Sequence, residues 1–443
     1  MDETFQRLLG KAPIAVLVRA TLEQTVSAAT LNDLFARHAH RQYTKELTFA
    51  TLVALMAKVT FRTHPSVHAA FRHTAGIGVS ITAVHDKLNH LETGISAALV
   101  QDTAQRLAAV RAALPAPRHP EPIAGLRVRT RDGNFLAGTE HRLDGLRAAG
   151  AAALPGMSLV VRDHSGLLTN LIPCEDAYTS ERSLWPPVAA LVEADDLWLA
   201  DRNFRTLDYM GEIAAQQAYF LIRHHAGTAL KPVTAARYVG SNATGDLWEQ
   251  KVQVGGLTPR RVSVRLHKPL RDGSREPRLL TNVPANRVGA RRLADLYRTR
   301  WFIESAFQEL TDSPRCEVNT LGYPKAALFA FALAVLAYNL LVVVEAALVS
   351  GQGQQRVAEE LSYYHLATEV KSHAEALPLV PGRTWQRCGR MSLQEFAGWL
   401  HELARNLDWK RYRKNPRGPK KPTQVKRTRR GAHRSTARVL QTP

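Results

Sequence analysis

A phenol, a guanidinium and a carboxylate lie within one short segment of the sequence, at Tyr297, Arg300 and Glu304. Steps of three and four residues place side chains on one face of an α-helix, so a helix through this segment would present all three together. A carboxylate is a preferred ligand of a hard divalent cation, and an arginine beside it can bind a phosphate group. The alternative is a core helix in which Arg300 and Glu304 form an internal ion pair.

Two aspartates follow predicted strands. A short apolar run at 197–200 predicts a buried strand with Asp201 directly after it. Upstream, apolar side chains alternate with arginines and predict a strand that leads to Asp132, where an Asp-Gly pair indicates a turn. An α/β sheet places its sites beyond the carboxyl ends of its strands. Each aspartate alone is more often a cap or turn residue, but together with Glu304 they form a more specific set.

The order Asp132, Asp201 and Glu304, with Tyr-x-x-Arg-x-x-x-Glu around the glutamate, resembles the DDE transposases of bacterial insertion sequences. The insertion-sequence-four family is the group that it resembles most, and segments 200–204 and 279–282 are similar to that family too. The resemblance covers roughly residues 126–349. It implies a ribonuclease-H-like α/β core with a β-rich insertion between the second aspartate and the glutamate.

The resemblance also implies the chemistry. Two Mg²⁺ ions, for which Mn²⁺ would substitute, activate the attacking oxygen and stabilise the leaving one in phosphodiester cleavage. Asp132 and Asp201 would take the central metal-binding roles, and Glu304 would flank them. Tyr297 and Arg300 would bind the neighbouring phosphate. The expected reaction is a nick at the ends of a mobile element, after which the freed 3′-hydroxyl attacks target DNA.

Other DNA contacts and partners follow from the same reasoning. Arg223, at a predicted strand end, and Trp248, a stacking or wedge residue, are candidate contacts in the inserted strands. Packing of Trp248 against the sheet is the alternative. The partner is double-stranded DNA, both as element ends and as target. Pairing two ends requires two active sites, so a homodimer on DNA is expected by analogy.

One position departs from the family pattern. The family usually carries a lysine seven residues after the glutamate, where this chain has Thr311. The difference affects an expected DNA contact more than the metal chemistry. It leaves open two alternatives, which are an inactive DNA-binding protein of transposase ancestry and a metal-dependent nuclease on the same fold.

The positive charge of the chain is concentrated near its C-terminus. Residues 410–443 contain 13 Lys and Arg and no Asp or Glu, while the whole chain has a net charge of +20. This predicts a basic, flexible tail that binds a polyanion. A membrane surface is another anionic partner, but no lipidation motif or amphipathic helix adjoins the tail. The candidate DNA contacts at its start are Lys410, Arg411, Arg413 and Lys414.

The cysteines and the N-terminus indicate a compartment. Cys174, Cys316 and Cys388 are far apart and include no C-x-x-C pair, which argues against a zinc site and against a disulfide framework. The N-terminus begins acidic and lacks a signal-peptide pattern. We expect a cytoplasmic, nucleoid-associated protein of a bacterium.

One segment, 326–344, contains no charged residue and is long enough to span a membrane. Its many alanines and its Tyr338-Asn339 pair favour a buried helix instead, and no membrane partner is expected. The predicted fold class is α/β, with five parts. These are a helical DNA-binding domain (1–117), a ribonuclease-H-like core (118–225 and 287–350), an inserted β subdomain (226–286), a C-terminal helical region (351–409) and the basic tail (410–443).

Overall fold

The computed structural model describes residues 3–61, 63–115, 122–136, 153–204, 206–224, 229–269, 273–312, 321–374, 376–415 and 434–441, without the side chains of 308–312, 434 and 439. The strands are β1 (Arg127–Phe135), β2 (Ala153–Leu154), β3 (Met157–Asp163), β4 (Leu168–Cys174), β5 (Asp196–Ala200), β6 (Tyr219–Arg223), β7 (Lys231–Pro232), β8 (Arg237–Ser241), β9 (Gly245–Gln253), β10 (Arg260–Leu266), β11 (Arg278–Thr281) and β12 (Arg434–Ser435).

The helices before the first strand are α1 (Glu3–Lys11), α2 (Pro13–Thr25), α3 (Ala28–His38), α4 (Phe49–Thr60), α5 (Val67–Arg72), α6 (Ile81–His90) and α7 (Thr93–Ala113). Those between and after the strands are α9 (Trp185–Ala189), α10 (Leu207–Ala215), α11 (Ala290–Arg298), α12 (Trp301–Asp312), α13 (Pro324–Gln352), α14 (Gln354–Glu360), α15 (Tyr363–His373), α16 (Gly382–Arg390), α17 (Leu393–Arg405) and α18 (Thr436–Gln441). Short 3-10 turns are η1 (Glu181–Leu184), η2 (Arg202–Phe204), η3 (Leu377–Leu379) and η4 (Trp409–Tyr412).

The protein is a mixed α/β structure built on one central mixed sheet. Its strand order is β4-β3-β1-β5-β6-β11-β10-β9-β7, with β8 paired to β9. β1, β5 and β6 are parallel neighbours, and the pairs on either side of them are antiparallel. All five residues of β5 are buried, as expected for a central strand covered on both faces. The finer ribonuclease-H-like assignment stays a prediction.

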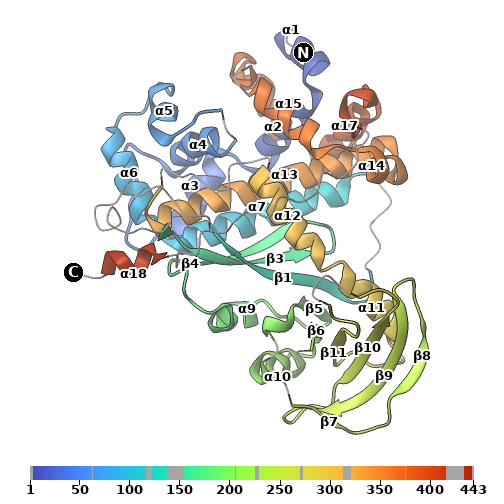
Figure 1. Cartoon of the computed structure of the whole chain (residues 1–443). Coiled ribbons are helices and arrows are strands. Elements are labelled where there is room, and N and C mark those ends of the chain that lie inside the picture. The colour runs from blue at the N-terminus through green and yellow to red at the C-terminus, as the bar shows by residue number, and fades with distance from the viewer. Residues whose placement is uncertain are drawn as a thin grey trace.

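Helices cover both faces of this sheet (Figure 1). On one face, α9 and α10 pack with the side chains of β3, β5 and β6 in one hydrophobic cluster. On the other face, α11 packs on β1, β5 and β10. α7 and α13 lie against β4 on that second side, beneath the remaining helices.

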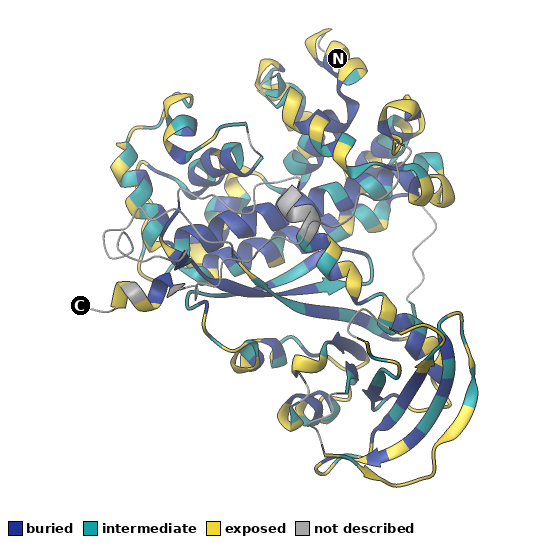
Figure 2. Ribbon diagram, viewed as in Figure 1, coloured by how far each residue is buried: buried dark blue, intermediate teal, exposed yellow. Residues whose placement is uncertain are grey.

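The buried apolar helix predicted at 326–344 is confirmed as part of α13. Among the described residues, α13 is the one helix long and apolar enough to cross a membrane, and its most apolar stretch is 94% buried inside the protein. Figure 2 shows this burial along the helix. Helices from both ends of the chain join α13 in a single hydrophobic cluster. The segments on either side of the predicted domain boundaries at 117 and 351 therefore share one hydrophobic core.

Three local expectations differ from the structure. β1 does not turn at Asp132 but continues to Phe135, because residues 129–135 pair antiparallel with β3. The segment around Arg300 is not one helix, since α11 ends at Arg298 and α12 begins at Trp301. The strands of the predicted β subdomain at 226–286 are continuous with the central sheet, because β11 pairs with β6.

The basic tail also differs from the expectation of a flexible segment starting at residue 410. η4 buries Trp409 and Tyr412, and β12 pairs with β2. The Ser435 hydroxyl and the Arg438 guanidinium both donate hydrogen bonds to Asp176. Both described ends of the tail are therefore attached to the protein, while residues 416–433, which carry most of its charge, lie outside the described residues.

Candidate active site

The two aspartates lie on neighbouring parallel strands. β1 pairs with β5 so that Thr130 is opposite Leu199. Asp132 lies two residues after Thr130, and Asp201 lies two residues after Leu199. The strand register therefore brings the two aspartates to the same level of the sheet. The strand predicted at 197–200 is confirmed as part of β5, with Asp201 directly beyond its end. The parallel pairing is the reason that two residues so distant in sequence meet.

Arg300 links Asp132 to Glu304. Its Nη1 lies 3.1 Å from Asp132 Oδ2, and its Nη2 lies 2.8 Å from Glu304 Oε1. Arg300 is 7% exposed, whereas the Glu304 side chain is 37% exposed. The Arg300–Glu304 ion pair that spacing alone allowed is therefore present, and Arg300 also pairs with Asp132 on β1.

Tyr297 lies close to Asp201. Its hydroxyl donates a hydrogen bond of 3.2 Å to the backbone carbonyl oxygen of Ala200, the last residue of β5. Burial raises the pKa of Tyr297 to about 12, and the nearby guanidiniums of Arg300 and Arg223 oppose that shift. The phenol therefore remains a proton donor near neutral pH, and Arg223 lies within its electrostatic range.

The other two carboxylates affect the pKa of Asp132. Burial raises the pKa of Asp132 to about 6; Arg300 opposes this rise, while the negative charges of Asp201 and Glu304 reinforce it. Asp201 and Glu304 thus both lie within electrostatic range of Asp132. Mutual repulsion of this kind is relieved when a cation binds between the carboxylates.

The fit to a metal ion is partial. Carboxylate oxygens are the donors that Mg²⁺ prefers, so the donor set is suitable. In the part of the chain that the structure describes, no group of three or more His, Cys, Asp or Glu side chains is arranged to hold a metal ion. Arg300 instead pairs with two of the three carboxylates. Metal binding here belongs to the proposal below.

Two residues near the aspartates were missed by the sequence reasoning. Asn203 donates its backbone N–H to Asp201 Oδ1 over 2.7 Å and its side-chain amide to Glu181 Oε2 over 3.2 Å. Glu181 Oε1 lies 2.0 Å from where a Cβ on Gly133 would be, so Gly133 leaves room for this carboxylate. Burial raises the pKa of Glu181, and Asp201 reinforces the rise. The Asp-x-Asn spacing indicates a turn, but no local signal identifies Glu181.

A buried cation supports the site from the opposite face of β1. Arg131 is 1% exposed, and its guanidinium carbon lies 3.9 Å from the ring centroid of Phe204, 4.2 Å from Tyr209 and 5.0 Å from Trp185. Cations lie favourably over aromatic faces. Phe204 belongs to η2, directly after Asp201, so this packing holds the turn that positions that aspartate.

The remaining predicted DNA contacts are spread over the molecule. Trp248 is half-buried on β9, separated from β5 by β6, β11 and β10. Its ring contacts Tyr238 at a centroid distance of 5.7 Å, and the Arg265 guanidinium lies 4.3 Å from it. The alternative in which Trp248 packs against neighbouring strands therefore has contacts to support it. A DNA contact by Trp248 stays a prediction.

The four basic residues at the start of the tail lie against the C-terminal helices. Lys414 donates hydrogen bonds to the carbonyl oxygens of Ala358 and Glu359 at the end of α14. Arg413 forms an ion pair with Glu360, and Arg411 forms one with Glu369. Lys410 is exposed. Three of these side chains thus have structural partners, and their contact with DNA stays a prediction, as does the effect of Thr311, whose side chain lies outside the described part.

Comparison with protein families matched one domain model to this chain. Residues 132–340 match the family model described as a transposase DDE domain. The matched region begins at Asp132 and includes Asp201, the break between α11 and α12 at Arg300, and Glu304. The match supports a transposase of the DDE type. The narrower insertion-sequence-four assignment stays a prediction.

A solved structure is also similar, although distantly. It is described as a cryo-EM structure of piggyBac transposase in a synaptic complex with hairpin DNA. The two chains are 8% identical, with a TM-score of 0.41 over 91% of this chain and 87% of that one. The comparison with curated proteins found no match.

Proposed function

We propose that this protein is a DNA transposase that cleaves the ends of a mobile element and joins them to target DNA. The observation that carries the proposal is that Asp132 and Asp201 lie at one level of the sheet, with Arg300 joining Asp132 to Glu304, within the region matched by the transposase domain. Its partners are double-stranded DNA at element ends and at the target, and a second copy of the chain on the DNA. Its place is the bacterial cytoplasm, at the nucleoid.

The chemistry assigns a role to each residue. Asp132, Asp201 and Glu304 would hold Mg²⁺, or Mn²⁺ in its place. Bound divalent ions supply an activated attacking oxygen and stabilise the leaving one. Arg300 and Tyr297 are donors at the same place, suited to the oxygens of an adjacent phosphate. Arg300 Nε has no hydrogen-bond partner among the described residues, so this guanidinium retains capacity for a ligand.

A second function has a specific observation behind it. Arg300 already neutralises two of the three carboxylates, and Thr311 stands where the family has lysine. Both features fit a chain that binds DNA without cutting it. A nuclease that cuts without joining differs in its product, because it would never form strand-transfer joints.

The test compares cleavage of a labelled duplex that carries the gene's own flanking ends, in Mg²⁺, in Mn²⁺ and in EDTA. Asp201→Asn should abolish cleavage while DNA binding remains, because it removes a proposed metal ligand. Asp195→Asn, a change of the same kind at the opposite end of β5, should cleave normally, since Asp195 is exposed and pairs with Arg287. DNA binding without cleavage in either metal would support the inactive alternative. Cleavage without joint products would support the nuclease.

A further inference from the structure

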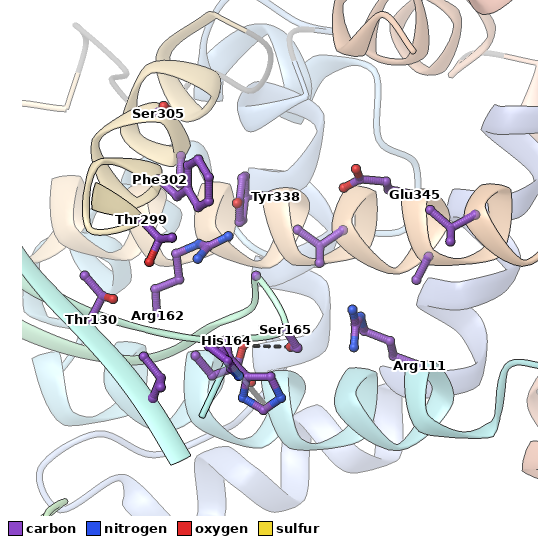
Figure 3. Close-up of a pocket in the computed structure, with 18 of the residues that line it drawn as sticks. Arg111, Thr130, Arg162, His164, Ser165, Thr299, Phe302, Ser305, Tyr338 and Glu345 are labelled. Carbon is purple, nitrogen blue, oxygen red and sulfur yellow. Dashed lines mark hydrogen bonds between the residues drawn. The ribbon is translucent and has the colours of Figure 1, made fainter. Parts of the chain in front are cut away.

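A cavity of about 550 Å³ lies beside the candidate active site (Figure 3). Its walls come from α7, the turn between β3 and β4, α12 and α13. Thr130 lines it two residues before Asp132 on β1, and alternate residues of a strand share a face about 7 Å apart. Phe302 and Ser305 line it from α12. The cavity therefore adjoins the part of β1 that carries Asp132.

Two arginines in this cavity, Arg111 and Arg162, have a nitrogen without a hydrogen-bond partner among the described residues. The Nε atoms of Arg111 and Arg162 are buried without a hydrogen bond among the described residues. A buried donor without an acceptor destabilises a protein by about 1–3 kcal/mol, and by more when the group is charged. Burial also lowers the pKa of Arg111. In Figure 3 both side chains extend toward α13, with Arg162 near Phe302. The guanidiniums thus offer unused donors to an acceptor in the cavity.

Two acidic residues line the cavity, Glu345 and Asp163, and among the described residues neither forms a hydrogen bond with these arginines. Glu345 accepts a hydrogen bond from the Tyr363 hydroxyl. Burial raises the pKa of Glu345, which disfavours its negative charge. In the part of the chain that the structure describes, neither Arg111 nor Arg162 forms an ion pair with it. Asp163, on the turn, is already bonded to Ser165 and to the Leu167 backbone.

We propose that this cavity binds a phosphate group through Arg111 and Arg162, and that the phosphate belongs to the DNA strand held at the adjacent carboxylates. Arginine is suited to phosphate because its planar fork donates two parallel hydrogen bonds. The cavity is large enough for part of a nucleotide and not only for the phosphate. The inference about the source of the phosphate rests on the proposed function. The phosphate chemistry itself would equally fit a free nucleotide.

DNA binding tests the proposal in EDTA, where cleavage plays no part. Arg111→Gln and Arg162→Gln should each weaken binding about tenfold, the loss expected for one charged hydrogen bond. Each should also lower the slope of log affinity against log salt by about one. The control is Arg405→Gln, which removes an exposed charge on α17 and should leave the slope unchanged. Glu345→Gln should bind as tightly as the wild type or more tightly.

Further experiments identify the source of the phosphate and control for variants that do not fold. Titration with inorganic phosphate and with a deoxynucleoside monophosphate separates the sources. Binding of these ligands that is lost in both variants assigns the cavity to free phosphates and overturns its DNA role. Their failure to bind, combined with the salt effect, supports the DNA strand. If a Gln variant does not fold, Arg162→Lys keeps the charge and should keep the slope. Slopes equal to that of Arg405→Gln would overturn the phosphate site, whether or not the protein cleaves DNA.

Discussion

At the scale of single residues, Arg131 is a buried charge that forms no ion pair with the described residues. Its guanidinium lies among three aromatic rings and is nearly inaccessible to water. The Nε and Nη1 atoms have no hydrogen-bond partner among the described residues. Contact with the rings, the volume of the side chain and attraction to the nearby carboxylates of Glu181 and Asp201 hold it on the opposite face of β1.

Substitution separates these two contributions. Arg131→Ala should reduce the free energy of unfolding by about 2–5 kcal/mol, because it leaves a cavity among Trp185, Phe204 and Tyr209. Arg131→Met should cost less than half as much, because it fills most of the volume and removes a desolvated charge. Thermal unfolding of both variants measures the difference. Equal losses would mean that the charge, and not the volume, is what the rings require.

Glu345 makes stability depend on pH. Its pKa is raised by burial, against the opposing effects of Tyr363, Arg111, Arg162 and Lys414. A group with a raised folded-state pKa contributes stability that is complete below its unfolded pKa and is lost as pH rises through the folded value. Glu345→Gln should therefore gain in melting temperature relative to the wild type as pH increases above about 4.5.

The measurement is the difference in melting temperature between Glu345→Gln and the wild type from pH 4 to 8, on the order of a few degrees. Glu402→Gln, at an exposed position of α17, is the control and should show no such trend. A difference that shrinks with increasing pH would contradict the raised pKa.

At the scale of elements, the break between α11 and α12 positions the basic and acidic residues. The Thr299 hydroxyl donates to the carbonyl oxygen of Leu296, and the Arg300 N–H bonds to that of Tyr297. Threonine hydroxyls compete with helical bonding in this way. The redirected chain allows Tyr297 to reach β5 while Arg300 reaches β1.

Close packing of two helices depends on a glycine. A Cβ at Gly351, near the end of α13, would lie 2.5 Å from the backbone nitrogen of Arg405 at the end of α17. Gly351→Ala should force the helices apart and cost about 1–3 kcal/mol. Gly398→Ala, in the middle of α17 where a Cβ meets nothing within 4 Å, should be neutral or stabilise by up to about 1 kcal/mol. Thermal unfolding compares the two, and an unchanged melting temperature in Gly351→Ala would refute the contact.

At the scale of the whole molecule, the charge of the tail should dominate general DNA affinity. Deletion of residues 416–443 removes nine Lys and Arg. Because each neutralised phosphate releases counterions, the deletion should weaken binding to random duplex and flatten its salt dependence. Anisotropy titrations at several salt concentrations measure both effects.

Release of the tail end provides the control for this deletion. Asp176→Asn weakens the links to Ser435 and Arg438 without removing a basic residue. It should preserve or strengthen DNA binding. If the deletion left affinity and salt dependence unchanged, the tail would have no part in binding DNA.

Local sequence patterns predicted much of the fold. The apolar run before Asp201 predicted a strand, and the uncharged segment before Val344 predicted a buried helix, because burial on all sides selects continuous apolar sequence. Asp132, Asp201 and Glu304 were identifiable from residue type, from their positions at predicted strands or on a predicted helix, and from the resemblance. The structure sets Asp132 beside Asp201 and joins Asp132 to Glu304 through Arg300, and the catalytic roles of these residues stay a prediction.

The sequence by itself determined which segments are buried, which residue types the site contains and where the positive charge lies, since these depend on neighbouring residues only. Tertiary structure decided that β1 continues past Asp132, that Arg300 joins two carboxylates, and that Glu181 lies against Gly133. Each of these rests on strand pairing or on contacts between residues far apart in the chain. Local periodicity does not depend on such distant partners, so only the folded structure could identify them.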